Sequence, residues 1–209
     1  MEGYRYRVQV SPHRVDRSYG EFRPGQHHGV VMPGDWDQRT YPTTGNPLVR
    51  MAFAHWRDGL SWEETGAVAH QMERIRTHGS LYADGLRLHD DVLRRYERLD
   101  QLFELTRRTG EFPPQANAVD GIYIHLDREG RAVFGQRGVH RFVIATLLEL
   151  EQVVAQLGAV HPLSPQARMF RLLPSRRLTA LPPQTQDTDP RPPALRRVLR
   201  RRRLHPPTG

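Results

Sequence analysis

Apolar residues recur at helical spacing in the first half of the chain and follow strand-like patterns in the second half. The longest helical pattern runs from His89 to Arg108, with apolar residues three and four positions apart. Acidic residues stand near its start, arginines stand at its end, and Gly110 follows. This order complements the helix dipole and places a glycine at the C-terminal cap. The pattern therefore predicts a long amphipathic helix over 89–108.

Two shorter helices are predicted before this one. The first begins at Asn46, a good N-terminal cap that is followed by a proline, and ends at Gly59. The second follows Ser61 and Glu64, which have the spacing of a capping box, and ends near Gly79. Residues 46–118 are therefore predicted to form a helical region.

A compact β-β-α-β pattern occupies the second half. Apolar residues over 121–126 and 131–134 predict two strands joined by a turn that ends with Gly130. A helix is predicted over 139–150, and a third strand over 153–160. Together these elements predict an α+β protein in which a helical part packs on a small β-β-α-β core.

The two ends of the chain have less regular patterns. Tyr4–Val10 alternates apolar and polar residues, which predicts a half-buried strand. From position 162 onward, 48 residues include ten prolines and 11 arginines, so we expect disorder with a short helix around Ala194–Leu204. The chain thus divides into an irregular N-terminal segment with one strand (1–45), a helical region (46–118), the core (119–161) and a basic, Pro-rich tail (162–209).

The net charge of +8 belongs to the tail. Residues 162–209 contain 11 arginines and two aspartates, whereas residues 1–161 contain 20 basic and 21 acidic residues. The tail arginines could hold nucleic acid through its phosphates without sequence preference, and a solvated tail with no partner is the alternative. The candidate contacts are Arg196, Arg197, Arg200, Arg201, Arg202 and Arg203.

Composition excludes several kinds of chemistry. The chain has no cysteine and no lysine, which excludes disulfides, thiolate metal sites, a cysteine nucleophile, a P-loop lysine and a Schiff-base lysine. Its 11 histidines show no metal-binding spacing, so no metal ligands are predicted among them. No apolar run approaches the length of a membrane helix and no signal peptide is evident, so we expect a cytoplasmic protein without a membrane partner.

The segment between the second strand and the following helix carries the clearest chemical signal. A glycine-containing turn before a helix exposes backbone N–H groups, and the helix N-terminus adds partial positive charge, so the two favour an anion. Arg141 would clamp a phosphate, and His140 would act as donor or as general acid or base. Spacing alone leaves a solvent-facing loop as the alternative. The candidate ligand-binding residues are Gln136, Arg137, Gly138, His140 and Arg141.

Two carboxylates and one further histidine have alternative roles. Asp35 and Asp37 flank Trp36 and could act in catalysis with His140, one of them holding Mg²⁺ that comes with a nucleotide. The interpretation that we favour is a turn whose tryptophan fills the core. His161 ends the last predicted strand, where it could face the phosphate site or cap the strand.

Residues 121–161 resemble the ParB/sulfiredoxin-like fold. The matching motifs are the strand Ile122-Tyr123-Ile124 and the run Gly138-Val139-His140-Arg141-Phe142. More narrowly, the chain is similar to uncharacterised proteins with a ParB-like nuclease-type domain, through Gly34-Asp35-Trp36-Asp37 and Trp62-Glu63-Glu64-Thr65. The resemblance covers residues 30–161. It implies that the Gly-x-His-Arg turn binds the phosphate of a nucleotide or of nucleic acid.

The departures from these families narrow the expectation. Val139 stands where sulfiredoxins carry their catalytic cysteine, so sulfinic acid reduction is excluded. Glu149 stands where relatives commonly have glycine, Arg137-Gly138 replaces an Asp-Gly or Gly-Gly pair, and no helix-turn-helix pattern follows. The resemblance therefore implies a nucleotide-dependent phosphotransferase or hydrolase. The alternatives are a non-specific DNA-binding or nuclease-like protein that uses the turn and the tail, and a scaffold without a ligand.

Overall fold

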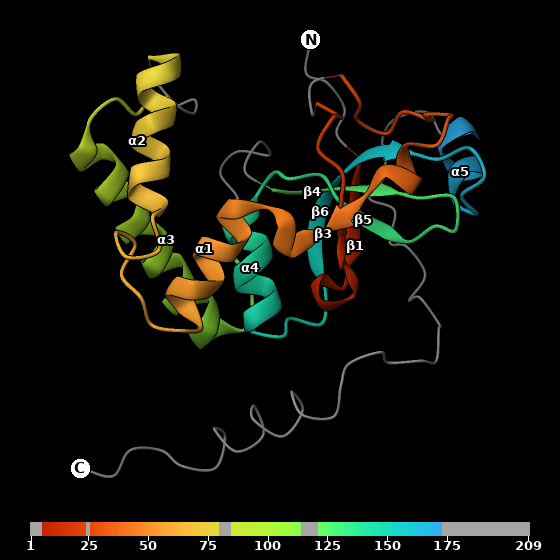
Figure 1. The fold of residues 1–209 in the computed structure, drawn as a ribbon. Helices are drawn as coiled ribbons and strands as arrows, with labels where there is room; N and C mark the ends of the chain where they lie inside the picture. Colours follow the sequence, from red (N-terminus) through yellow and green to blue (C-terminus); the bar gives the residue numbers. More distant parts are fainter. Residues whose placement is uncertain (1–5, 24–25, 80–84, 114–120, 173–209) are drawn as a thin grey trace.

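The computed structural model describes residues 6–23, 26–79, 85–113 and 121–172. Over these residues the fold is mixed α/β, with a six-stranded mixed sheet in the order β1-β6-β4-β5-β2-β3 and five α-helices. The helices α1 and α4 lie between the sheet and the pair formed by α2 and α3 (Figure 1). The predicted helix at 194–204 and the six candidate arginines of the tail lie outside the described residues.

The elements confirm the predicted order of helices and core strands. The helices are α1 (Pro47–Trp56), α2 (Ala67–His78), α3 (His89–Thr109), α4 (Val139–Leu147) and α5 (Ala167–Leu172). The strands are β1 (Arg7–Val10), β2 (Arg17–Ser18), β3 (Tyr41–Pro42), β4 (Ile122–Leu126), β5 (Ala132–Phe134) and β6 (Val153–Val160). Short 3₁₀ helices are η1 (Pro12–Arg14), η2 (Trp36–Arg39) and η3 (Thr43–Gly45).

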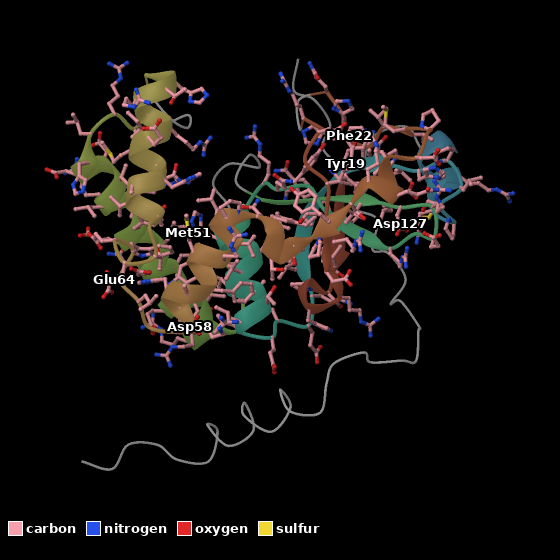
Figure 2. All side chains as sticks on the ribbon, in the orientation of Figure 1. Tyr19, Phe22, Met51, Asp58, Glu64 and Asp127 are labelled. Carbon is pink, nitrogen blue, oxygen red and sulfur yellow. The ribbon has the colours of Figure 1, made fainter. Side chains whose placement is uncertain are left out.

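The strand β4 is central and is buried on both faces. It pairs with β5 in antiparallel and with β6 in parallel orientation. Ile122, Ile124 and Leu126 belong to the core on the helical side. Tyr123 and His125 alternate with them and point to the opposite face, where Tyr19, Phe22 and Trp36 surround the ring of His125. Figure 2 shows Tyr19 and Phe22 close together over the sheet, away from the helical side that carries Met51.

Both predicted caps form, but the second helix begins later than predicted. The side chain of Asn46 accepts a hydrogen bond from the Leu48 N–H at 2.9 Å, as a capping residue should. Ser61 and Glu64 form both hydrogen bonds of the predicted capping box, at 3.1 and 2.7 Å. The helix nevertheless begins only at Ala67, because Gly66 adopts a left-handed backbone with φ of 78° and interrupts the chain of helical residues.

The helix α4 is shorter than predicted, for a local reason. It ends at Leu147, and Glu149 adopts a left-handed conformation with φ of 51°. The N–H of Leu150 then donates to the carbonyl of Ala145 at 3.0 Å, which is the closing hydrogen bond of a Schellman motif. Glycine is the usual residue at such a position because it has no Cβ.

The two ends of the described chain hold more structure than expected. The segment predicted to be irregular contributes β2 and β3 to the sheet. The strand predicted from position 4 is observed from Arg7, and residues 4 and 5 lie outside the described part. The expectation of disorder from position 162 is wrong as far as position 172, because α5 forms and Ala167 is only 1% exposed in the core. None of the helices in the described ranges is long and apolar enough to cross a membrane.

Candidate functional site

The turn between β5 and α4 is pinned against the start of β4. The N–H of Tyr123 donates to the carbonyl of Arg137 at 3.2 Å, and the N–H of Gly135 donates to the carbonyl of Tyr123 at 2.7 Å. Gly138 has φ of 68°, and a Cβ at this position would lie 2.7 Å from the carbonyl oxygen of Gly121. Glycine is therefore required at 138 both by its backbone conformation and by this close approach.

The start of α4 has the backbone features of a helix N-terminus. The helix begins after Gly138, and no acidic residue stands in its first turn. The first N–H groups of any α-helix lack an intrahelical acceptor, and the helix dipole adds about half a positive charge there. Arg141 adds a guanidinium, which lies 5.2 Å from the centre of the Phe112 ring. Among the described residues, this first turn therefore brings a guanidinium and no carboxylate to the helix start.

His140 is buried among aromatic rings and does not face solvent. It is 8% exposed. The rings of Trp56, Trp62 and Tyr96 lie 6.2, 5.9 and 5.9 Å from the His140 ring, each nearly perpendicular to it. Burial, together with the smaller effect of the nearby charge of Arg95, lowers the pKa of His140 to about 3. At neutral pH the imidazole is thus uncharged, so it can donate a hydrogen bond and is a poor general acid.

We call the rings of Trp56, Trp62 and Tyr96 around His140 the aromatic cage. A carboxylate on α3 accepts hydrogen bonds from two of them. Asp100 accepts hydrogen bonds from the indole N–H of Trp56 at 2.9 Å and from that of Trp62 at 3.1 Å. It also accepts one from Nε2 of His55 at 3.0 Å, while Nδ1 of His55 faces the carbonyl of Leu60. The His55 ring is stacked on Trp62, with the ring centres 4.0 Å apart.

The sequence contained a signal for Asp100 that was not used. The residue stands four positions after Tyr96, on the otherwise apolar stripe of the 89–108 helix. A lone carboxylate on such a stripe needs donors, and indole N–H groups are donors that tryptophan brings into a core.

The predicted ligand-binding residues separate into two groups. His140 and Arg141 point toward the helical side of the turn, where their ring and charge contacts lie. Gln136 and Arg137 lie on the opposite side. The side chain of Gln136 rests against Gly20, and the charge of Arg137 acts on Tyr123, whose pKa is raised by burial to about 12. A ligand at Gly138 would therefore meet the two groups from different sides.

The structure does not bring Asp35 and Asp37 to this turn. Asp37 accepts hydrogen bonds from Nε and from the backbone N–H of Arg128, at 2.7 and 3.1 Å, and these lower its pKa. Asp35 accepts one from the same guanidinium at 2.8 Å. Arg128 stands two residues after the last residue of β4, whereas Gly138 contacts the first, and a strand of this length separates its ends by about 13 Å.

The favoured interpretation of this aspartate pair fits the structure. Trp36 is 3% exposed and donates its indole N–H to the carbonyl of Met32 at 3.0 Å. The segment is therefore a turn whose tryptophan fills the core, and both of its carboxylates pair with Arg128. Within the ranges that the structure describes, no group of three or more His, Cys, Asp or Glu side chains could hold a metal ion.

Two further histidines have structural surroundings. Nδ1 of His161 accepts from the N–H of Leu163 at 3.1 Å, and Nε2 donates to the carbonyl of Gly34 at 3.0 Å. His161 thus caps the end of β6, far from Gly138. His125 is fully buried, and a bulge in β6 turns the N–H of Ala159 toward its Nδ1 at 3.0 Å. Burial, with nearby His27, lowers the pKa of His125 to about 3.

Comparison of the chain with protein-family models, curated proteins and solved structures gives no match. The resemblance to the ParB/sulfiredoxin-like fold therefore rests on the sequence motifs.

Proposed function

We propose that the protein binds a phosphate-bearing ligand, in particular a nucleotide, at the turn between β5 and α4 of a ParB/sulfiredoxin-like core. The observation that carries this proposal is the start of α4. A left-handed Gly138 is pressed against β4, no acid stands in the first helical turn, and the guanidinium of Arg141 lies beside it. Backbone N–H groups, the helix dipole and an arginine are the elements from which phosphate sites are built.

Each residue of the turn has a distinct role in this proposal. Arg141 clamps the phosphate, because a guanidinium can make two parallel hydrogen bonds to its oxygens. His140 donates one hydrogen bond as a neutral imidazole, since burial holds its pKa near 3. Arg137 is exposed and Gln136 is half-buried on the other side of the turn, where they would contact the remainder of the nucleotide.

The enzyme version of this proposal is a nucleotide-dependent phosphotransferase or hydrolase. Mg²⁺ would then arrive with the nucleotide phosphates, because Asp35 and Asp37 are held by Arg128 at the other end of β4. A magnesium ion in such a site neutralises charge on the phosphate oxygens. The competing proposal is that the same turn and the arginine-rich tail hold the backbone of nucleic acid.

Calorimetry tests the binding proposal directly. ATP, CTP and their diphosphates are titrated into the full chain with and without magnesium, and the same is done with Arg141→Ala. Loss of one charge-assisted contact should weaken binding by at least roughly tenfold. The control is Arg108→Ala, which removes an exposed arginine at the end of α3 and should leave binding unchanged. Heat with none of the nucleotides would reject the proposal.

Removal of the tail separates the two proposals. Because Ala167 is buried in the core, the truncation is placed after position 172. A nucleotide-binding protein should keep its affinity for nucleotides. A nucleic-acid-binding protein should instead lose most of its affinity for DNA, together with the salt dependence that comes from neutralising phosphates.

A further inference from the structure

The ring of His125 lies between two glycines on the face of the sheet that is opposite to the main core. The residue is fully buried. A Cβ added at Gly135, just after β5, or at Gly158, in β6, would collide with the ring. The imidazole therefore reaches toward both neighbouring strands, and other side chains have to shield its remaining surface from water.

Three rings shield His125, and we call Tyr19, Phe22 and Trp36 the aromatic cover. Their centres lie 6.4, 5.1 and 5.9 Å from the centre of the His125 ring, and the three rings also contact one another. The cover belongs to a small hydrophobic cluster with Val133 and Ala159, which is separate from the main core. A local opening of the cover therefore leaves the main core closed, because the two share few apolar contacts.

The hydrogen bond of His125 fits the uncharged ring alone. Nδ1 accepts from the N–H of Ala159 at 3.0 Å, so the hydrogen of the neutral imidazole is on Nε2. A second proton would have to bind at Nδ1, where it would meet the N–H of Ala159. Protonation therefore breaks this hydrogen bond and places a charge among apolar rings, which is costly.

The groups around the ring do not neutralise such a charge. Burial is the main cause that raises the pKa values of Tyr19 and Tyr123 to about 12, so both hydroxyls are uncharged between pH 5 and pH 7. Within the described ranges, the charge of His27 acts on the ring and disfavours the proton, whereas the backbone of Tyr19 favours it. The other charged or titratable groups on the surrounding segments pair with one another or with the backbone, namely Glu21, Arg39, Asp35, Asp37, Arg128 and His161.

The cover also supports the turn between β5 and α4. Gly20 directly follows Tyr19, and a Cβ at Gly20 would collide with the side-chain amide of Gln136. Gln136 has a left-handed backbone with φ of 61°. A residue other than glycine keeps such a conformation only where its surroundings hold it. The contact with Gly20 is one of these surroundings, so movement of the cover changes the support of the turn.

We propose that His125 is a proton-sensitive support of the aromatic cover, and that protonation of its ring releases the cover from the sheet while the main core stays folded. Release withdraws Gly20 from Gln136, so acid also loosens the turn. The release itself requires no ligand. Its effect on a ligand rests on the proposed function.

Amide hydrogen exchange at pH 7 and pH 5 tests the release in the full chain. The N–H groups of Tyr19 and Met32, which donate to the carbonyls of Phe134 and Val160, report the cover, and that of Ile124 reports the main core. With pKa values of about 3 in the closed state and 6.5 in the open state, opening of the cover should become roughly 25-fold more frequent at pH 5, after correction for intrinsic exchange rates. Equal protection of all three amides at both pH values would overturn the proposal, since the cover would then open only with the whole fold.

The matched variants are substitutions of the two buried histidines. His125→Asn keeps an acceptor for the N–H of Ala159 but does not titrate, so most of the 25-fold change at Tyr19 and Met32 should disappear. His140→Gln, on the helical side, should keep it. An undiminished change in His125→Asn would overturn the proposal. If that variant does not fold, Phe22→Leu takes its place: it should raise exchange of the cover at both pH values and leave Ile124 unchanged, and an equal rise at Ile124 would count against a separate cover.

Calorimetry with ATP and magnesium at pH 7 and pH 5 tests the effect on a ligand. The loss of affinity at pH 5 should be smaller in His125→Asn than in the unaltered chain. An equal loss in both proteins would overturn the link from the cover to the turn. If no nucleotide binds at either pH, the proposed function fails, whereas release of the cover is still decided by the exchange of Tyr19 and Met32.

Discussion

Acidification should destabilise this protein through its two buried histidines. His125 and His140 have pKa values of about 3 in the folded protein, against 6.5 for an exposed histidine. Their folded pKa values are lowered, so the unfolded chain binds protons more readily and stability falls as the pH falls below about 6.5. From pH 7 to pH 5 each histidine should cost about 2 kcal/mol, or about 4 kcal/mol together. That is a large part of the typical stability of a domain.

The assay is urea unfolding at several pH values, followed by tryptophan fluorescence. The midpoint should fall steadily between pH 7 and pH 5, a range in which Asp37 and Asp91, whose pKa values are lowered, remain charged. In His125→Asn the amide oxygen can still accept from the N–H of Ala159, and in His140→Gln the titrating ring is absent. Each variant should lose about half of the pH dependence, although it is less stable at pH 7.

The control is His89→Gln, which removes an exposed histidine at the start of α3 and should leave the pH dependence unchanged. A flat stability between pH 7 and pH 5 would refute the reasoning, because it would mean that the two rings are hydrated or already charged in the folded state. An undiminished slope in both His125→Asn and His140→Gln would refute it as well.

Three other substitutions test particular features by urea unfolding at pH 7. Glu149→Gly should stabilise the protein by about 1 kcal/mol, because glycine adopts the left-handed backbone conformation at the end of α4 without the strain that a Cβ causes. The control Glu151→Gly, at a position without that conformation, should destabilise the protein slightly. Gly138→Ala should lower the free energy of unfolding by about 3 kcal/mol or more and abolish ligand binding. In the control Gly34→Ala the added Cβ would meet open space, so the loss of stability should be only about 1 kcal/mol. Equal losses of stability in the two variants would show that the contact with Gly121 is unimportant. Asp100→Ala should cost about 2 kcal/mol and alter tryptophan fluorescence, since two indole groups lose their acceptor; an unchanged spectrum would contradict the cage.

The features that were predicted correctly depend on residues that are close together in the sequence. The cap at Asn46, the span of α3 with its C-terminal Gly110, and β6 over 153–160 follow from spacing and from local hydrogen bonds. The strand β2 could not be predicted in this way. It has two residues and exists because Ser18 lies opposite both Phe134 and Tyr41, which are distant in the sequence.

The site shows the same division between local and distant contacts. The sequence identified His140 and Gly138, because a turn before a helix is a local motif. It could not show that Trp56, Trp62 and Tyr96, contributed by the helical region, would bury His140 and lower its pKa.

The hydrogen bonds to Asp100 have a consequence for local unfolding. They tie α1, the segment after it and α3 to one carboxylate, and the rings that they hold enclose the start of α4. These segments should therefore open together, as one cooperative unit in amide hydrogen exchange. A ligand that contacts only the first turn of α4 would then slow exchange along α3 as well, in residues that it never touches.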